Sequence, residues 1–579
     1  MTGGSEVDPI IVAVLANRLD AITKEMGETM LRTSRSPIFA ENRDFVTAIF
    51  DRHLRLVAQT AYIPVLLGAS PHAMKAIARH FEGEVRPGDV FILNDPFSGN
   101  NHLPDISVAR PVFCDGTLRF WAFTKGHHSD VGGGGAGGYN ASAKSIFDEG
   151  LRIPPARLFR AGEYQSDIWG IILKNVRLPS LVEGDLHCQV GATAIGERAL
   201  QALLEKYGPA TLEQAMDEIL LASHRQMKRE LENIPQGTYY GERKMDHDGV
   251  GEMPTIRLKV IARGGEGIVF DFEGTDPQVP FFLNSSLPNT WSSCYAALYT
   301  SIDPDIKFNE GSLSLVSVRA PEGSIVNPRE PAPTTNCTVL TTATIVEAIW
   351  LALAQAIPRQ TQAAWSRIPT GIGAGTDPRT GMPFACIHLF AKGGSGATYG
   401  YDGWNNIAPV VSMGGSRIPD PELFEIVTPH FIVEYELLSG SAAPGRWRGG
   451  FGVSYKVRFE ADDTRLAITG GGQYDETVPF GLAGGRSARR STIALRRPDG
   501  SRIDFGAMAS YYPSRGDVME IASSGGGGYG DPLERDVDEV LKDVRDELIS
   551  TEEAERDYGV VIDRLEVDVG KTLSRRSNK

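Results

Sequence analysis

The dipeptide Asp115-Gly116 restricts the fold of this chain more than any other short feature. It stands between two strand-like stretches, residues 105–114 and 117–127. Asp-Gly between such stretches is typical of a two-residue hairpin turn, and a turn of that length fixes the register of both strands. The sequence therefore predicts a β-hairpin in which Cys114 faces Thr117.

The open end of this hairpin is predicted to gather three side chains of the metal-ligand type. Carried along the strands, the register places Asp105 opposite Gly126 and Pro104 opposite His127. Opposed Cβ atoms lie about 4.5–5.5 Å apart and diagonal ones about 7–8 Å, so Asp105 and His127 converge there with His102. Two imidazoles and one carboxylate suit zinc, manganese or iron(II), with positions left for water and substrate. A hairpin whose polar residues only cap turns is the alternative.

Neighbouring polar residues leave the ligand set open at this stage. His128 is either the ligand in place of His127 or, like Asp130, a group that orients the ligands. Asp44 precedes a predicted strand over residues 45–50. There it is either a general base that activates water or a solvated turn residue.

Composition indicates a folded protein of several domains. A chain of 579 residues is too long for one hydrophobic core, and 41% apolar with 23% charged residues is ordinary for globular proteins. A net charge of -15 disfavours nucleic acid and anionic membranes as partners. Neither a signal peptide nor an apolar run of about 18 residues is found, so we expect a cytoplasmic protein. Five scattered cysteines fit buried thiols.

Local signals predict a mixed α/β (α+β), multidomain fold that carries the metal site on a β-hairpin and ends in helices. Asp8-Pro9 opens a long helix, and two further helices are expected to pair over residues 185–232, the second capped by Thr211. Thr342 is the expected cap of a later apolar helix. The predicted divisions are an N-terminal α/β domain with the metal site (8–235), a β-rich domain (236–327), a Gly-rich α/β domain (328–530) and a C-terminal helical tail (531–579).

The sequence carries no nucleotide-binding loop. Gly570-Lys571-Thr572 ends like a P-loop, but Leu565 occupies the position of its first glycine. If the reaction uses ATP, a partner is expected to bind it.

The chain resembles the hydantoinase B/oxoprolinase family over nearly its whole length. The resemblance rests on short motifs spread along the sequence: Arg43-Asp44-Phe45, Asn94-Asp95-Pro96, His102-Leu103-Pro104-Asp105, Gly126-His127-His128-Ser129-Asp130-Val131-Gly132, Glu149-Gly150-Leu151-Arg152, Arg446-Trp447-Arg448-Gly449-Gly450 and Gly527-Gly528-Tyr529-Gly530-Asp531-Pro532. Asn101 and Ser129 depart from the usual family pattern beside the expected site.

The resemblance implies a metal-bearing subunit of an ATP-dependent hydrolase of cyclic amides, such as hydantoins, 5-oxoproline or larger lactams. A hydantoinase A-like partner would bind ATP and magnesium and phosphorylate the amide oxygen, in a hetero-oligomer of the A2B2 type. By motif, His102, Asp105 and His127 look like the residues that hold manganese in the acetone carboxylases of this family. Asp44 looks like the aspartate that activates water.

Two other functions are compatible with the same resemblance. One is an ATP-dependent ketone carboxylase of the acetone or acetophenone type. The other is a non-catalytic scaffold subunit in which the metal site is lost or merely structural.

Overall fold

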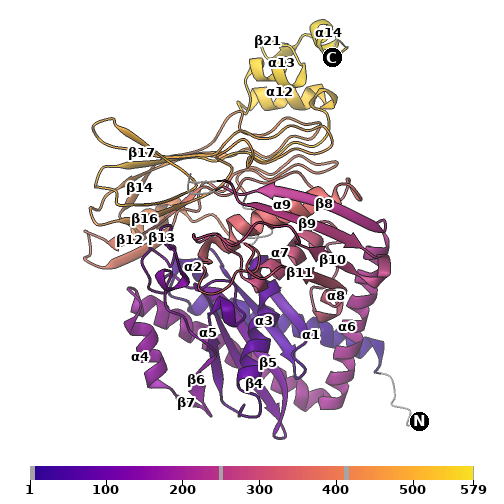
Figure 1. The fold of residues 1–579 in the computed structure, drawn as a ribbon, viewed down its shortest axis with the longest axis vertical. Helices are drawn as coiled ribbons and strands as arrows, with labels where there is room; N and C mark the ends of the chain where they lie inside the picture. Colours follow the sequence, from indigo (N-terminus) through magenta and orange to yellow (C-terminus); the bar gives the residue numbers. More distant parts are fainter. Residues whose placement is uncertain (1–6, 247–251, 408, 410–415, 578–579) are drawn as a thin grey trace. The chain divides into compact units, whose positions relative to one another are not determined.

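The hairpin predicted around Asp115-Gly116 lies at the centre of a seven-stranded antiparallel sheet (Figure 1). The structure is a computed structural model that describes residues 7–246, 252–407, 409 and 416–577. By its internal contacts the chain divides into two units. The first comprises residues 1–240, 258–338 and 415–417, and the second comprises residues 241–257, 339–414 and 418–579.

The first unit is built on that seven-stranded sheet. Its strands run in the order β2-β1-β5-β4-β3-β6-β7. They are β1 (Phe45–Asp51), β2 (Leu56–Ala61), β3 (Val90–Leu93), β4 (Asp105–Cys114), β5 (Thr117–His127), β6 (Ala156–Arg160) and β7 (Glu163–Tyr164). β4 and β5 are interior strands, and most of their side chains are buried.

Helices cover both faces of this sheet. On one face, α5 comes so close to β5 that a Cβ at Gly196 would lie 3.0 Å from Ala122, so a glycine suits this position. On the other face, Trp121 of β5 lines a hollow together with Lys75 of α3. The helices of this region are α1 (Pro9–Thr33), α2 (Pro37–Ala40), α3 (Pro64–His80), α4 (Ser166–Lys174), α5 (Pro179–Tyr207) and α6 (Pro209–Glu232).

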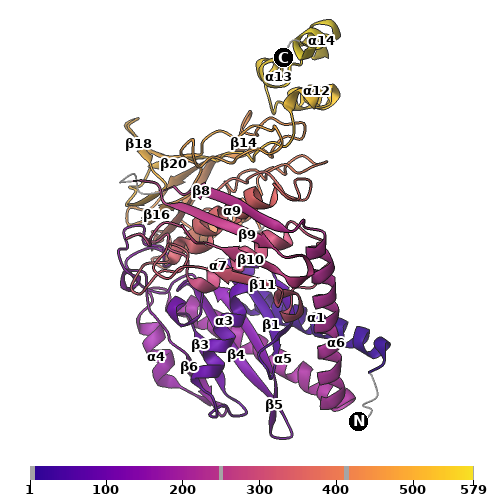
Figure 2. The same cartoon turned by 45° about the vertical axis from the view of Figure 1, so that its right-hand side comes forward.

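A second, four-stranded sheet follows in the order β11-β10-β9-β8, and Figure 2 shows its strands side by side. β9 and β10 form an antiparallel pair, and β11 adds to β10 in parallel. The elements are β8 (Gly237–Lys244), β9 (Thr255–Ala262), β10 (Ile268–Asp271), α7 (Leu287–Tyr299), α8 (Glu310–Leu313) and β11 (Val316–Arg319). A short 3-10 turn, η4 (Thr335–Thr338), completes the first unit.

The second unit packs two antiparallel sheets around one apolar core, in which Tyr455, Phe459 and Met519 are fully buried. The sheet orders are β13-β12-β16-β19 and β14-β15-β20-β17-β18. The elements are α9 (Leu340–Leu353), β12 (Thr370–Thr376), β13 (Pro383–Ile387), α11 (Pro421–Val427), β14 (His430–Leu437), β15 (Val453–Phe459), β16 (Arg465–Thr469), β17 (Thr492–Arg496), β18 (Arg502–Phe505), β19 (Met508–Tyr511) and β20 (Val518–Ala522).

The chain ends in the helices that the sequence predicts. They are α12 (Val537–Arg545), α13 (Thr551–Tyr558) and α14 (Val569–Ser577), with the short strands β21 (Ile562–Asp563) and β22 (Glu566–Val567) between the last two. Ser550 and Glu553 form a capping box at the start of α13. The predicted fold class, mixed α/β with several domains and C-terminal helices, is confirmed.

The predicted hairpin register is wrong by one residue over most of its length. Cys114 faces Thr117 as expected, but a β-bulge beyond Val112 leaves Arg119 unpaired in the strand register. From there to the open end the pairing is shifted, so Asp105 faces His127 directly and Ile106 faces Gly126. A bulge adds one residue to one strand and therefore exchanges the faces on which the later residues lie.

Two predicted helix caps are also wrong. α6 begins at Pro209, so Thr211 lies inside it, and α9 begins at Leu340, so Thr342 lies inside that helix. Proline at the first helical position sets the backbone for α6 two residues earlier than the threonine does.

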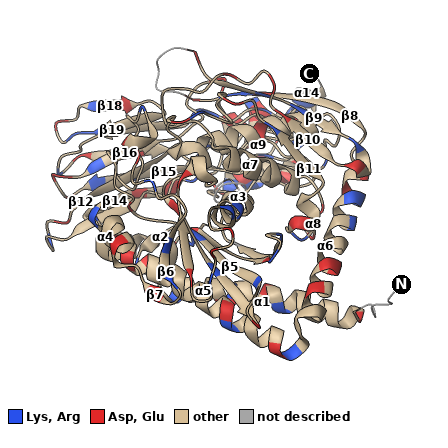
Figure 3. Cartoon of the chain, turned by 60° about the horizontal axis from the view of Figure 1, so that its bottom comes forward, with Lys and Arg blue, Asp and Glu red and all other residues tan. Residues whose placement is uncertain are grey.

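Charged residues of both signs are interspersed on the surface, as Figure 3 shows along α6. α6 therefore presents no continuous acidic face. Among the described helices, none combines the length and the apolar character needed to cross a bilayer.

A buried ion network lies inside the second unit. Arg367 is 1% exposed, and its guanidinium contacts Glu347 at 2.5 Å and Asp246 at 3.4 Å. Arg243 also contacts Glu347, at 2.8 Å. Two carboxylates removed from water are thus balanced by two guanidinium groups.

We expect Arg367→Met to destabilise the protein by about 3–5 kcal/mol, because it leaves a buried carboxylate without its partner. Urea unfolding followed by circular dichroism measures the change. Arg490→Met is the control, since Arg490 forms an exposed pair with Asp475 and its loss should change little. Equal unfolding midpoints for Arg367→Met and the wild type would contradict the proposed importance of the network.

Candidate metal centre

Three donor side chains meet at the open end of the hairpin. His102 Nε2 lies 2.9 Å from Asp105 Oδ1, and His127 Nδ1 lies 3.2 Å from the same oxygen. Asp105 begins β4 and His127 ends β5, directly opposite each other, while His102 lies in the loop that enters β4. All three are buried. The structure thus brings together the three residues that the sequence singles out.

Apart from contacts within the trio, two of its donor atoms have no hydrogen-bond partner among the described residues. They are His102 Nε2 and Asp105 Oδ2, and both are fully buried. Buried polar atoms in native proteins are nearly always satisfied, so convergent unsatisfied nitrogen and oxygen atoms are what a bound cation would explain. The donor set, two imidazoles and a carboxylate, fits a divalent metal.

The orientation of His102 is fixed from far along the chain. Its Nδ1 lies 2.5 Å from the carbonyl oxygen of Thr335, which accepts a hydrogen bond and leaves Nε2 free to face Asp105. The turn that carries Thr335 is itself held by Glu149. The Glu149 carboxylate accepts hydrogen bonds from the backbone N–H groups of Thr334 and Thr335, at 2.9 and 2.8 Å. A support of this kind is usual behind metal ligands.

The structure separates the two adjacent histidines. Side chains alternate along a strand, so His127 and His128 point to opposite sides. His127 joins Asp105, whereas His128 Nε2 donates to Gln189 Oε1 of α5 at 2.9 Å and its ring packs edge-on against Phe39. Geometry therefore favours His127 over His128 as a ligand.

Asp130 and Asp44, the other two residues that the sequence singles out, lie outside the trio. The Asp130 carboxylate accepts backbone N–H groups of Gly132 and Leu178, which anchors the loop after β5. Asp44 is partly buried just before β1, and its carbonyl oxygen accepts the backbone N–H of His127 at 3.0 Å. Burial lowers the pKa of His127, but the carboxylates of Asp105 and Asp44 outweigh this effect and raise it.

A tyrosine covers the imidazoles. The ring of Tyr139 lies edge-on to His102, with centroids 6.2 Å apart, and 5.9 Å from the ring of His127. The glycine-rich segment before Tyr139, residues 132–138, forms bends and turns. Gly135 packs so tightly under the Tyr139 backbone that a Cβ there would lie 1.9 Å from its carbonyl oxygen. Only glycine fits this approach.

Charges at the centre are coupled. Burial alone would raise the pKa of Asp105, but the imidazoles of His102 and His127 lower it below its ordinary value. Burial lowers the pKa of Lys125 to about 7. Lys125 Nζ donates to Asn101 Oδ1 at 2.8 Å, so the asparagine that departs from the family pattern binds the buried lysine.

Sequence reasoning missed three residues of this centre: Thr335, Glu149 and Tyr139. Glu149 opens one of the family motifs, but nothing in that motif assigns it a task. Tyr139 follows the glycine-rich run and carries no signal of its own. The contribution of Thr335 is a backbone carbonyl, which no residue type reveals.

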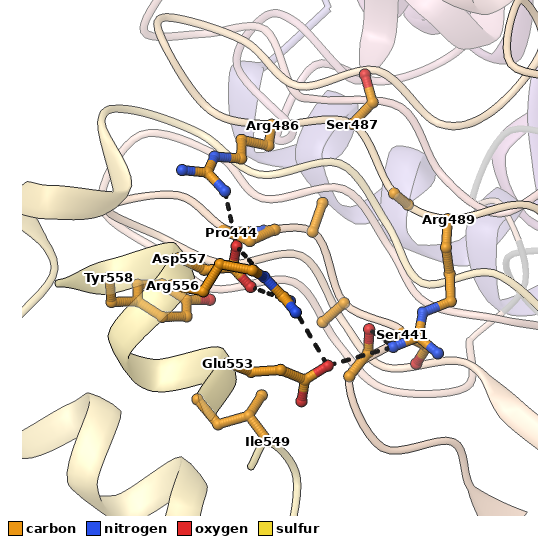
Figure 4. A pocket seen from close by; sticks show the side chains of 14 residues that line it. Ser441, Pro444, Arg486, Ser487, Arg489, Ile549, Glu553, Arg556, Asp557 and Tyr558 are labelled. Atoms are coloured by element: carbon orange, nitrogen blue, oxygen red, sulfur yellow. Dashed lines mark hydrogen bonds and ion pairs between the residues drawn. The ribbon is translucent and has the colours of Figure 1, made fainter. Parts of the chain in front are cut away.

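A surface pocket of about 280 Å³ in the second unit is lined by Arg486, Arg489 and Arg556 (Figure 4). Each guanidinium is paired with a carboxylate of α13. Asp557 contacts Arg486 at 2.7 Å and Arg556 at 2.6 Å, and Glu553 contacts Arg489 at 3.6 Å. The pocket therefore offers little free positive charge to an anion.

Comparisons with known proteins agree with the motifs. The chain is 36% identical to the beta subunit of the caprolactamase of Pseudomonas jessenii, over 96% of this chain and 97% of that protein. It is 30% identical to the B component of a putative D-/L-hydantoinase of Pseudomonas sp. (strain NS671), over 99% and 98%.

Solved structures share the fold. The crystal structure of the ATP-dependent caprolactamase from Pseudomonas jessenii matches with a TM-score of 0.92 at 34% identity, covering 99% of this chain and 100% of that one. A nucleotide-free acetone carboxylase structure matches with the same TM-score at 19% identity, covering 99% and 83%, which shows a common fold. The family model for hydantoinase B/oxoprolinase matches residues 8–532, and the chain belongs to that family.

Proposed function

We propose that this chain is the metal-bearing subunit of an ATP-dependent cyclic amide hydrolase. The observation that carries the proposal is the buried convergence of His102, Asp105 and His127, with donor atoms left unsatisfied. The relatives named as components of a caprolactamase and a hydantoinase support the reaction class. Their names also support a partner subunit, which we propose to be a hydantoinase A-like protein in an A2B2-type complex.

The partner would bind ATP and magnesium and phosphorylate the amide oxygen of a small cyclic amide. An amide is a poor electrophile, and phosphorylation of its oxygen makes the ring carbon open to attack by water. This division of labour suits a chain in which the sequence shows no P-loop. At 19% identity, the likeness to acetone carboxylase concerns the fold alone, whereas the caprolactamase subunit is 36% identical. We therefore propose ring hydrolysis rather than carboxylation.

His102, Asp105 and His127 would hold the metal. His102 Nε2 and His127 Nδ1 lie 2.9 and 3.2 Å from Asp105 Oδ1, so the three side chains would serve one ion together. The mixed nitrogen and oxygen donors suit manganese, zinc or iron(II). When bound, the ion stabilises negative charge that develops at the reacting centre.

Asp44 is proposed as the general base. It directly precedes β1, it is only partly buried, and its carboxylate is near enough to His127 to raise the pKa of that ring. From this position it would take a proton from the attacking water, while His102 and His127 keep their orientation through Thr335 and the strand register. Tyr139, packed over both imidazoles, would limit water at the centre.

We expect the purified chain to bind one Mn²⁺ per molecule and His102→Ala to lose this binding, because one of three ligands is gone. Metal analysis after dialysis gives the stoichiometry. His53→Ala is the control, since His53 is exposed and lies outside the centre. Full metal content in His102→Ala would remove the trio as the metal site and favour a scaffold role.

Glu149→Ala should weaken Mn²⁺ binding by about 10–100-fold without removing any ligand, because it frees the turn that holds the Thr335 carbonyl against His102. Calorimetric titration of the folded variant measures the affinity. Glu163→Ala, at an exposed strand end, serves as the matched control. Unchanged affinity in Glu149→Ala would show that the turn needs no such support.

Asp44→Asn should lower the rate of lactam hydrolysis by about 10²–10⁴-fold in the reconstituted complex, with metal content unchanged. The amide is nearly isosteric but accepts no proton. Product formation from caprolactam, a hydantoin and 5-oxoproline gives the rates, and Asp115→Asn in the hairpin turn is the control. Hydrolysis at the wild-type rate would rule out Asp44 as the base.

A further inference from the structure

A second group of donor side chains lies inside the apolar core of the second unit. It consists of Cys386, His388 and His430, all buried, with one donor atom from each lying within 4.8 Å of the others. Cys386 Sγ is 3.9 Å from His388 Nε2 and 3.7 Å from His430 Nδ1. The two imidazole rings are stacked, with centroids 5.1 Å apart. None of these residues belongs to the centre at the hairpin.

Strand geometry explains why these donors meet. Cys386 lies in β13 and His388 two residues later, so both side chains point to the same face. His430 opens β14, a strand of the other sheet, and reaches the cysteine across the core. The cluster therefore links the two sheets of the sandwich.

Space beside the donors is kept open by a glycine. Gly373 of β12 faces Cys386 in the sheet register. A Cβ at this position would lie 3.3 Å from Cys386 Sγ, 3.4 Å from His430 Cε1 and 3.8 Å from His388 Nε2. A Cβ would therefore be tight against Cys386 and in contact with both histidines, and the further atoms of a larger side chain would enter the space among the donors.

The surroundings are aromatic, with one hydroxyl placed to orient a ligand. Tyr455 Oη lies 3.0 Å from His388 Nδ1. If Nδ1–H donates to this oxygen, the lone pair of Nε2 points towards Cys386, the arrangement usual behind a metal-bound imidazole. Phe459 and Phe384 pack edge-on against His430. His430 turns its Nδ1, rather than its Nε2, towards Cys386 Sγ.

We propose that Cys386, His388 and His430 form a second metal site, which binds copper(I). With metal–sulfur and metal–nitrogen distances of about 2.3 and 2.0 Å, donors 120° apart are separated by about 3.7 Å. The two observed sulfur–nitrogen separations, 3.7 and 3.9 Å, are compatible with donors of one ion. One thiolate and two imidazoles are a soft donor set of the kind that copper(I) prefers.

Charge balance favours a monovalent ion. A thiolate with two neutral imidazoles carries one negative charge, so copper(I) makes a neutral complex, whereas zinc(II) leaves one positive charge in an apolar core. Burying an unpaired charge is costly. In binding, the Cys386 S–H bond breaks, a copper–sulfur bond forms, and one proton is released to solvent per ion, with no change of oxidation state.

The test is expression of the full chain in copper-supplemented medium, because the buried donors are best reached while the chain folds. Purification without oxygen, in the presence of a copper(I) chelator, should leave one copper(I) per chain. X-ray absorption should show one sulfur and two nitrogen neighbours. Cys386→Ala, His430→Leu and Gly373→Val should each retain less than a tenth of this copper, and Gly373→Val keeps every donor in the chain.

Matched controls separate the site from other thiols and from the hairpin centre. Cys188→Ala removes a buried cysteine elsewhere, and His102→Ala removes the hairpin centre; both should keep the copper. Circular dichroism of the copper-free variants verifies folding. Copper retained in folded Cys386→Ala, or absent from the wild type, would overturn the proposal. Zinc(II) bound to these residues in place of copper would overturn the assignment to a monovalent ion.

Discussion

One extra residue in β5 decides which side chains meet at the hairpin. Arg119 is left without a partner in the β4 register, and every pair beyond it is shifted by one. Without this bulge, Asp105 would share a face with Gly126 and His128. With it, Asp105 shares a face with His127. Strand alternation separates the two adjacent histidines onto opposite sides of the sheet, and the bulge decides which of them shares a face with Asp105.

The two proposed metal sites differ in their donor atoms, in the spacing of those atoms and in charge. At the hairpin, nitrogen and oxygen atoms lie about 3 Å apart and carboxylate charge is present, which suits a hard or borderline divalent ion. In the sandwich core, the sulfur and nitrogen atoms are more widely spaced and the walls are aromatic. Histidine is common to both clusters, so the third donor, an oxygen in one and a sulfur in the other, would set the preference of each proposed site.

Local signals predict much of the fold and the members of the trio. Asp8 caps α1 and Asp115-Gly116 turns the hairpin, since each acts through atoms a few residues away. The bulge is beyond the reach of such signals, because its extra residue is held by tertiary contacts such as Arg119 with Glu213 of α6. His430 lies 44 residues from Cys386, so no short spacing motif predicts the cluster of Cys386, His388 and His430. What can be predicted from the sequence is therefore limited by the separation of the interacting residues along the chain, rather than by their residue types.

The bond from His102 to the carbonyl of Thr335 joins residues 233 apart in sequence. A nascent chain of about 130 residues already contains all three donors of the hairpin centre. It still lacks Thr335, whose carbonyl fixes the tautomer and the orientation of the His102 ring. The centre acquires its final shape only when the turn near residue 335 has left the ribosome and docked. Metal selection at the proposed site would therefore belong to a late stage of biosynthesis, after the turn near residue 335 has docked.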